Sequence, residues 1–229
     1  MWFSTWRRLR TSNPAPRSRT PLRPRLEALE GRDVPSTLTV TNNLDSGPGS
    51  LRAEIAAAKN KDTIVFDPSL DGRTIMLTSG QLEIGKSLTI QGLGAGLVTV
   101  SGDLRSRVFQ VDQKVTVTLS GMTISNGHAG FVGTVYNNDG GGILNLGTLT
   151  VSGCILSGNS AGDSPFYSYG EHGNGGGIYN AGTLTVSNSI LTGNQAGSAG
   201  GGIYNAGTAT ISGCTLTSPS PSLTNVTTR

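Results

Sequence analysis

The chain has 229 residues, of which 35% are apolar, 5% aromatic and 14% charged, and it contains 34 glycines. Glycine at about twice its ordinary frequency, together with so few charges, argues against a helical bundle, a coiled coil or a charge-rich disordered chain. No stretch approaches about 18 consecutive apolar residues, so we expect no transmembrane helix. Because aromatic residues are so few, any core must be built from small aliphatic side chains.

The positive charge is concentrated at the N-terminal end. The net charge is +3, but residues 1–33 hold eight arginines and three acids, whereas the rest of the chain holds nine basic and eleven acidic residues. A segment such as RRLRTSNPAPRSRTPLRPR suits an anionic partner or an unstructured leader, and we interpret residues 1–35 as a basic, disordered leader or export segment. We expect no nucleic-acid partner. No apolar run follows Arg10, so the export route stays open.

The first part of the following region predicts one helix among short strands. Ser50 is a suitable N-cap, and Leu51 and Ile55 fall on one face of the helix that it begins. We expect this helix to cap the end of a stack of strands, where apolar core and strand edges would otherwise be exposed. Alternating apolar residues predict strands at 38–40, 63–66, 74–77, 87–90, 98–100 and 108–111.

From Gly140 onward the chain repeats itself. Three copies begin with glycine triplets: GGGILNLGTLTVSGCILSGNSA at Gly140, GGGIYNAGTLTVSNSILTGNQA at Gly175 and GGGIYNAGTATISGCTLT at Gly200. The copies are offset by 35 and 25 residues, and a fainter copy occupies 115–129. Period-two alternation within a unit, with Gly-Asn and Ala-Gly corners between the runs, predicts short strands without helices. The repeats therefore predict a parallel β-helix over 36–217, in which each copy is one coil.

Alignment of the copies predicts which side chains stack. Apolar ladders should join Ile143, Ile178 and Ile203, and likewise Val151, Val186 and Ile211. We expect Asn145, Asn180 and Asn205 to form an amide ladder at a corner, and Tyr179 and Tyr204 to stack on the surface. Cys154 and Cys214 fall two coils apart with Ser189 between them, at a Cα separation of about 9.6 Å that is too long for a disulfide.

The end of the chain shows no helix signal. After Leu216 the sequence continues as TSPSPSLTNVTTR, so we interpret 218–229 as a Ser/Pro/Thr-rich tail. The last coil is then covered by this tail, by a partner, or by nothing because the chain is a fragment. An uncovered coil would allow end-to-end self-association.

These residues resemble a known group of proteins. The segments SGPGSLRAEIAAAKNKDTIVFDPSL, SLTIQGLGAGLVTVSG and the GGGIYN copies are similar to bacterial right-handed parallel β-helix proteins of the pectin-lyase-like superfamily with a CSLREA-like N-terminal segment. The GGGIYN copies also resemble repeats of polymorphic outer membrane proteins. RPRLEALEGRDVPS resembles a leader motif of bacterial surface proteins, with Gly31 in place of the usual acidic residue. The resemblance implies an all-β, single-stranded right-handed parallel β-helix outside the cell, usually of unknown biochemical role.

Relatives of this fold include polysaccharide lyases and glycoside hydrolases. Such lyases use acidic calcium ligands beside a basic residue, and such hydrolases use two carboxylates about 5 to 10 Å apart. The repeats from Gly140 to Thr217 contain no Lys or Arg, and their only acids are Asp163 and Glu171. We therefore expect no catalytic residues, metal or cofactor, although the enzyme hypothesis stays as the alternative.

Two insertions carry the candidate site. They occupy 127–140 and 162–174, leave the coil at equivalent points before a glycine triplet, and should emerge side by side. Aromatic rings beside carboxylates and amides suit sugar stacking with hydrogen bonding, although the rings could equally pack the loops onto the coil. The candidate residues are His128, Phe131, Tyr136, Asp139, Asp163, Phe166, Tyr167, Tyr169, Glu171 and His172.

The sequence thus favours a secreted or surface-exposed β-helix that acts as a non-catalytic binding, adhesion or structural module. The expected ligand is carbohydrate, such as a polysaccharide or a cell-surface glycan. The alternative is a polysaccharide lyase or glycoside hydrolase of the same superfamily, and a third hypothesis is a structural fragment whose open end pairs with another chain.

Overall fold

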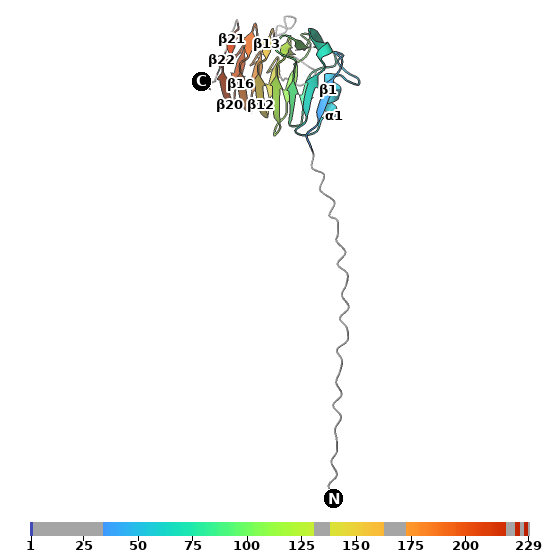
Figure 1. Cartoon of the computed structure of the whole chain (residues 1–229). Helices are drawn as coiled ribbons and strands as arrows, with labels where there is room; N and C mark the ends of the chain where they lie inside the picture. Colours follow the sequence, from blue (N-terminus) through green and yellow to red (C-terminus); the bar gives the residue numbers. More distant parts are fainter. Residues whose placement is uncertain (2–33, 131–137, 163–172, 219–222, 225–226, 229) are drawn as a thin grey trace. The chain divides into compact units, whose positions relative to one another are not determined.

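The structure is a computed structural model that describes Met1 and residues 34–130, 138–162, 173–218, 223–224 and 227–228. The chain divides into two compact units, Met1–Asp33 and Val34–Arg229. The described residues of the second unit form one short α-helix, one 3-10 turn and otherwise β-strands, which are arranged in four parallel sheets. Short parallel strands are stacked along the whole unit (Figure 1).

The largest sheet, called sheet 1, has eight strands. In spatial order they are β1 (Thr37–Val40), β2 (Thr63–Phe66), β5 (Leu88–Gln91), β8 (Thr116–Ser120), β12 (Thr148–Ser152), β16 (Thr183–Ser187), β20 (Thr208–Ser212) and β23 (Thr227–Thr228). Inward and outward side chains alternate along the strands from β1 to β20, as half-buried strands require. β12, β16 and β20 can be followed side by side in Figure 1.

Two further sheets have six strands each. Sheet 2 consists of β4 (Leu82–Ile84), β7 (Phe109–Val111), β11 (Ile143–Asn145), β15 (Ile178–Asn180), β19 (Ile203–Asn205) and β22 (Leu223–Thr224). Sheet 3 consists of β3 (Arg73–Met76), β6 (Val98–Ser101), β9 (Thr123–Ser125), β13 (Ile155–Ser157), β17 (Ile190–Thr192) and β21 (Thr215–Thr217).

Sheet 4 is small, and it completes the repeating path of the chain. Its strands are β10 (His128–Ala129), β14 (Ser160–Ala161) and β18 (Gln195–Ala196). From β7 onward the chain visits sheets 2, 1, 3 and 4 in the same order, and each visit pairs in parallel with the preceding one. The repeats of the sequence are therefore stacked coils, and the predicted parallel arrangement is confirmed.

The predicted strand register is confirmed in the repeats. Ile143 pairs with Ile178 and Ile178 with Ile203, while Val151 pairs with Val186 and Val186 with Ile211. These side chains are at most 3% exposed and belong to one continuous aliphatic core. One coil orders too much backbone for the few apolar side chains that it buries, so the coils depend on stacking.

The first glycine of each triplet is needed for the turn into sheet 2. Gly140, Gly175 and Gly200 have φ values of 70°, 68° and 68°. A Cβ at Gly175 would also meet the carbonyl oxygen of Ile178. At Gly140 and Gly200 it would meet the carbonyl oxygen of the equivalent isoleucine. An L-residue is strained at such angles, so both the conformation and the space favour glycine.

The helix predicted from Ser50 is confirmed as α1 (Leu51–Ala57). The Ser50 hydroxyl accepts a hydrogen bond from the Ala53 amide, and Leu51 and Ile55 are buried against the core. A 3-10 helix, η1 (Pro68–Leu70), follows β2 and is capped by Asp67. In the described part of the chain no helix is long and apolar enough to cross a membrane.

The tail pairs with the last coil at two described places. β22 lies beside β19, and β23 lies beside β20. Among the possibilities considered from the sequence, the structure thus shows pairing by the tail itself on sheets 2 and 1. The edge strand of sheet 3, β21, pairs only with β17 in the described residues.

Candidate functional site

Two of the ten predicted site residues, His128 and Asp139, lie in the described structure. The other eight lie outside the described residues: Phe131, Tyr136, Asp163, Phe166, Tyr167, Tyr169, Glu171 and His172. The described ends of the two insertions lie side by side, because the Gly140 amide donates to the Asn174 carbonyl oxygen at 2.9 Å. The described ends of the insertions, called stems below, therefore leave the stack at adjacent positions.

Asp139 fastens these two stems together. Its Oδ1 accepts hydrogen bonds from the backbone amide of Asn174 at 2.8 Å and from the side-chain Nδ2 of Asn174 at 3.1 Å. This carboxylate therefore has a structural task at the base of the insertions.

His128 lies on β10, in the wall of a cleft. Its Nδ1 is 2.8 Å from the hydroxyl oxygen of Ser160 on β14, one coil further. Burial lowers the pKa of His128 below its ordinary value, so the imidazole is neutral at pH 7. A Cβ at Gly130 would collide with the ring, so position 130 must stay small beside it.

The cleft has a volume of about 500 Å³ and lies over the outer side of the first coils of sheet 2. It brings His128 together with polar residues from two other stretches of the chain, 79–83 and 105–110. Its lining residues are Ser79, Gly80, Gln81, Glu83, Arg105, Ser106, Arg107, Gln110, His128, Ala129 and Gly130. None of these except His128 was a predicted site residue.

Arg107 is the most strongly held side chain of the cleft. The residue is 6% exposed, and its guanidinium donates to Gln81 Oε1 at 2.6 Å, to the Asp139 carbonyl oxygen at 2.7 Å and to the Gly140 carbonyl oxygen at 2.9 Å. Burial lowers the pKa of Arg107 to about 10, against the opposing charges of Asp139 and Glu83. The group stays charged at neutral pH and joins the stem of the first insertion to the start of β4.

Side-chain amides form the polar surface next to Arg107. Gln81 Nε2 donates to Gln110 Oε1 at 3.0 Å and to Glu83 Oε1 at 3.2 Å, while Gln110 Nε2 donates to Asp112 Oδ1 at 3.0 Å. Each amide is thereby oriented by its neighbours. The amide and carboxylate groups retain further donor and acceptor positions that suit the hydroxyl groups of a ligand.

The same outward row of sheet 2 becomes aromatic further along the stack. Glu83, Gln110, Leu144, Tyr179 and Tyr204 occupy successive register positions. The predicted stacking of the two tyrosines is confirmed, with ring centroids 5.4 Å apart and planes inclined by 13°. Both tyrosines are half-buried rather than fully exposed. Burial raises the pKa of Tyr179, and the nearby charges of Asp139 and Tyr204 add to the shift.

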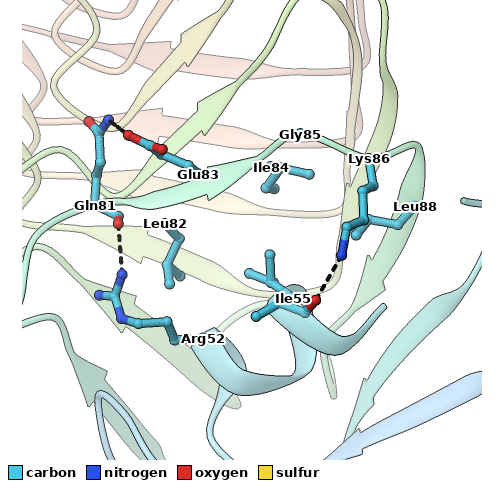
Figure 2. Close-up of a pocket in the computed structure, with 10 residues that line it drawn as sticks. Arg52, Ile55, Gln81, Leu82, Glu83, Ile84, Gly85, Lys86 and Leu88 are labelled. Carbon is cyan, nitrogen blue, oxygen red and sulfur yellow. Dashed lines mark hydrogen bonds between the residues drawn. The ribbon is translucent and has the colours of Figure 1, made fainter. Parts of the chain in front are cut away.

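A second pocket, of about 290 Å³, lies between α1 and β4 (Figure 2). Its floor is formed by Ile55, Leu82 and other apolar side chains of the cap and of the first coil. Arg52 Nη1 donates to the Gln81 carbonyl oxygen at 2.8 Å, and Lys86 Nζ donates to the Ala56 and Ala58 carbonyl oxygens, both at 2.7 Å. Arg52 and Lys86 therefore hold α1 to the stack, and this pocket lies along the interface between the two.

The described lining of the cleft can be compared with the groups that hydrolysis and elimination require. Within the described residues, Glu83 is the one carboxylate that lines it, whereas glycoside hydrolysis uses a pair. The described residues also contain no group of three or more metal-ligating side chains that could hold an ion. The guanidinium of Arg107, the side chain closest to the basic group of a lyase, is engaged by Gln81 and by two backbone carbonyls.

The sequence matches no protein-family model and no curated protein sequence. The function must therefore be argued from the residues. Sequence reasoning missed the cleft because its members are separated in the chain by about one coil and become neighbours only through stacking. One signal was present: Glu83 and Gln110 stand at outward positions that are occupied by Leu144, Tyr179 and Tyr204 in the later copies.

Proposed function

We propose that the unit 34–229 is a right-handed parallel β-helix that binds carbohydrate on the outer face of sheet 2. The repeated path through parallel sheets supports the β-helix, and the right-handed sense follows from the strong preference of parallel crossover connections. The GGGIYN copies support a relation to pectin-lyase-like and polymorphic outer membrane protein repeats.

The observation that carries the binding proposal is the outward row of sheet 2. A cleft of about 500 Å³ with oriented amides lies at one end of this row, and a stacked pair of tyrosines lies further along it. Aromatic faces pack against the apolar faces of sugar rings, and amides and carboxylates accept and donate hydrogen bonds to hydroxyl groups. A concave polar site next to an aromatic platform is a typical binding arrangement.

We further propose an extracellular or cell-surface location and a role in adhesion. The arginine-rich leader and its likeness to leaders of bacterial surface proteins support this location. The insertion residues Tyr167 and Tyr169 lie outside the described structure and remain candidate ligand residues on the sequence alone.

Binding can be measured by affinity electrophoresis of the full chain in gels that contain neutral or anionic polysaccharides. Gln110→Ala removes one oriented amide and Tyr204→Ala one stacking ring, and each change should weaken binding by roughly tenfold. Gln91→Ala is the matched control, because Gln91 is an exposed glutamine on sheet 1.

Retardation that is lost with Gln110→Ala and kept with Gln91→Ala supports the proposal. Equal retardation of all variants, or none for the unmodified chain, contradicts it. A parallel absorbance assay for unsaturated products tests the lyase alternative, and steady product formation would replace binding by catalysis as the function of the cleft.

A further inference from the structure

The outer face of sheet 1 carries a regular array of threonines that no part of the proposed carbohydrate site uses. Strands β8, β12, β16 and β20 read TVTLS, TLTVS, TLTVS and TATIS. Strand pairing aligns their outward residues in two threonine columns. One column is Thr116, Thr148, Thr183 and Thr208, and the other is Thr118, Thr150, Thr185 and Thr210.

The hydroxyl groups of this threonine array are free for an external partner. None of the eight hydroxyls makes a hydrogen bond within the described part of the protein. Other outward hydroxyls of the stack do bond one another: Ser187 donates to Ser152 on sheet 1 at 3.2 Å, and Thr217 donates to Thr192 on sheet 3 at 3.0 Å. The first column is exposed along its whole length, and the second is exposed at Thr185 and Thr210.

The array is also rigid and uncharged. No charged residue occurs in any of its four strands. The alternate side chains of β8, β12 and β16, such as Leu149, Val151 and Val186, are at most 1% exposed and anchor the face to the core. Threonine is stiff at χ1 in such a setting, because both of its Cβ substituents are heavy atoms.

Strand geometry fixes the two repeats of the array. Neighbouring coils are about 4.8 Å apart, and threonines two positions apart on one strand are about 6.6 Å apart. Large sheets usually twist, and those that are flat are typically stabilised by stacking or by side-chain ladders. Such ladders run through these coils at Asn145, Asn180 and Asn205.

All hydroxyl groups of a flat regular array can bind a partner at the same time only if the partner presents its own groups at a matching regular spacing. Both spacings are close to the spacings of the oxygen atoms on a prism face of hexagonal ice. That face is neutral and offers hydrogen-bond donors and acceptors in equal number. The uncharged face complements such a surface. A charged or flexible polymer does not present a neutral, regular set of groups that would match this face. We infer that the threonine array of sheet 1 is an ice-binding surface.

The full chain should therefore partition into growing ice and produce a gap between melting and freezing temperatures. Thr150→Lys and Thr185→Lys each place a long cation in the middle of the array, and each should lower the fraction of protein in ice roughly tenfold. Thr215→Lys is the matched control, because Thr215 is an exposed threonine on sheet 3. Circular dichroism melting curves check that all three variants keep the fold.

Partition into ice that is lost with Thr150→Lys and kept with Thr215→Lys supports the inference. Exclusion of the unmodified chain from ice overturns it, and so does an equal loss in the sheet 1 variants and the control. Binding to insoluble crystalline polysaccharide through Thr150, without entry into ice, also overturns it by assigning the array to a different lattice. Gln110→Ala leaves this face intact, so failure of the carbohydrate site is measured separately.

Discussion

Individual residues in this protein are constrained by their place in the coil, as the two cysteines show. Both are free thiols, but Cys154 is 1% exposed whereas Cys214 is partly exposed in the last coil. Burial raises the pKa of Cys154 above its ordinary value, which keeps the thiol protonated and unreactive. Equivalent positions in two coils therefore differ in chemistry because only one of them has a complete coil on both sides.

A thiol-reactive dye should thus modify one cysteine in the native protein and the second only after denaturation. The Cys214→Ser variant should show no fast phase, and the Cys154→Ser variant should keep it. The rates can be followed by the absorbance of the released chromophore at neutral pH. Fast reaction of both thiols in the native chain would contradict the burial of Cys154.

Gly175 allows a second test at the scale of one residue. Gly175→Ala adds both the strain of a left-handed L-residue and a collision with the Ile178 carbonyl oxygen, and should destabilise the fold by about 3 kcal/mol. Gly96→Ala shares the positive φ, at 87°, but has open space around its Cβ, and should cost only about 1 kcal/mol.

Urea unfolding followed by circular dichroism measures both glycine variants. Equal destabilisation by Gly175→Ala and Gly96→Ala would show that conformation alone, and not space, selects glycine at the start of each triplet.

At the scale of elements, an ion pair contributes to the attachment of α1 at the N-terminal end of the stack. Arg52 on α1 donates to Asp45 Oδ1 at 2.7 Å, and Asp45 Oδ2 accepts hydrogen bonds from the Ser79 amide at 3.0 Å and from the Ser79 hydroxyl. Burial alone would raise the pKa of Asp45, but the bonds from Ser79 and Arg52 bring it below its ordinary value. The folded state therefore prefers the charged carboxylate.

This preference predicts an acid-labile cap. A lowered folded-state pKa stabilises the fold fully above about pH 4, and the stabilisation is lost as the pH falls through the folded-state pKa. The unmodified chain should melt at a higher temperature than Asp45→Asn at pH 6, and this difference should shrink as the pH falls below about 4. Melting curves of the two proteins across this range measure the effect, and a difference that stays constant with pH would exclude Asp45 as its source.

Elements with a strong alternating pattern were the ones predictable from sequence. The strands expected at 63–66, 87–90 and 108–111 agree with β2, β5 and β7 to within one residue at either end. β4 was missed because Glu83 interrupts a run of only three residues, and the strands of sheet 4 are too short to show a period at all. The amide pair of Asn159 and Asn194, bonded at 2.9 Å, was also missed, although both follow a Gly in the corresponding SGN and TGN segments.

The cleft was less predictable than the strands for a physical reason. Arg107 and Gln81 are 26 residues apart and meet only because consecutive coils stack. The sequence showed the register of the later copies, where motifs repeat, but the first coils lack the glycine triplet that would have aligned them. Residues such as His128 and Asp139 were found because they belong to an insertion that ends at a recognisable triplet.

The whole molecule is held in register by ladders that cross several coils. Asn180 is fully buried, its Nδ2 donates to Asn205 Oδ1, and its Oδ1 accepts from Asn145 Nδ2, both at 2.6 Å. Asn180→Ala removes the side-chain hydrogen bonds that join this coil to both neighbouring coils and should destabilise the fold by about 3 kcal/mol. Hydrogen exchange should accelerate on β11 and β19 together, because the damage lies between them.

The control for this ladder is Asn43→Ala, since Asn43 makes only an exposed hydrogen bond to the Thr74 carbonyl oxygen. It should change stability by no more than about 0.5 kcal/mol. Faster exchange confined to β15 in the Asn180→Ala protein would show that each coil is stabilised on its own and that the ladder does not couple them.

The glycine triplets have a consequence for how such a chain changes length. Because every triplet begins a coil at the same point of the circuit, a segment such as 175–199 can be duplicated or deleted and still leave each remaining coil with a matching neighbour. Relatives of this protein should consequently differ by whole coils, with the N-terminal cap and the polar first coils constant and the number of GGGIYN copies variable.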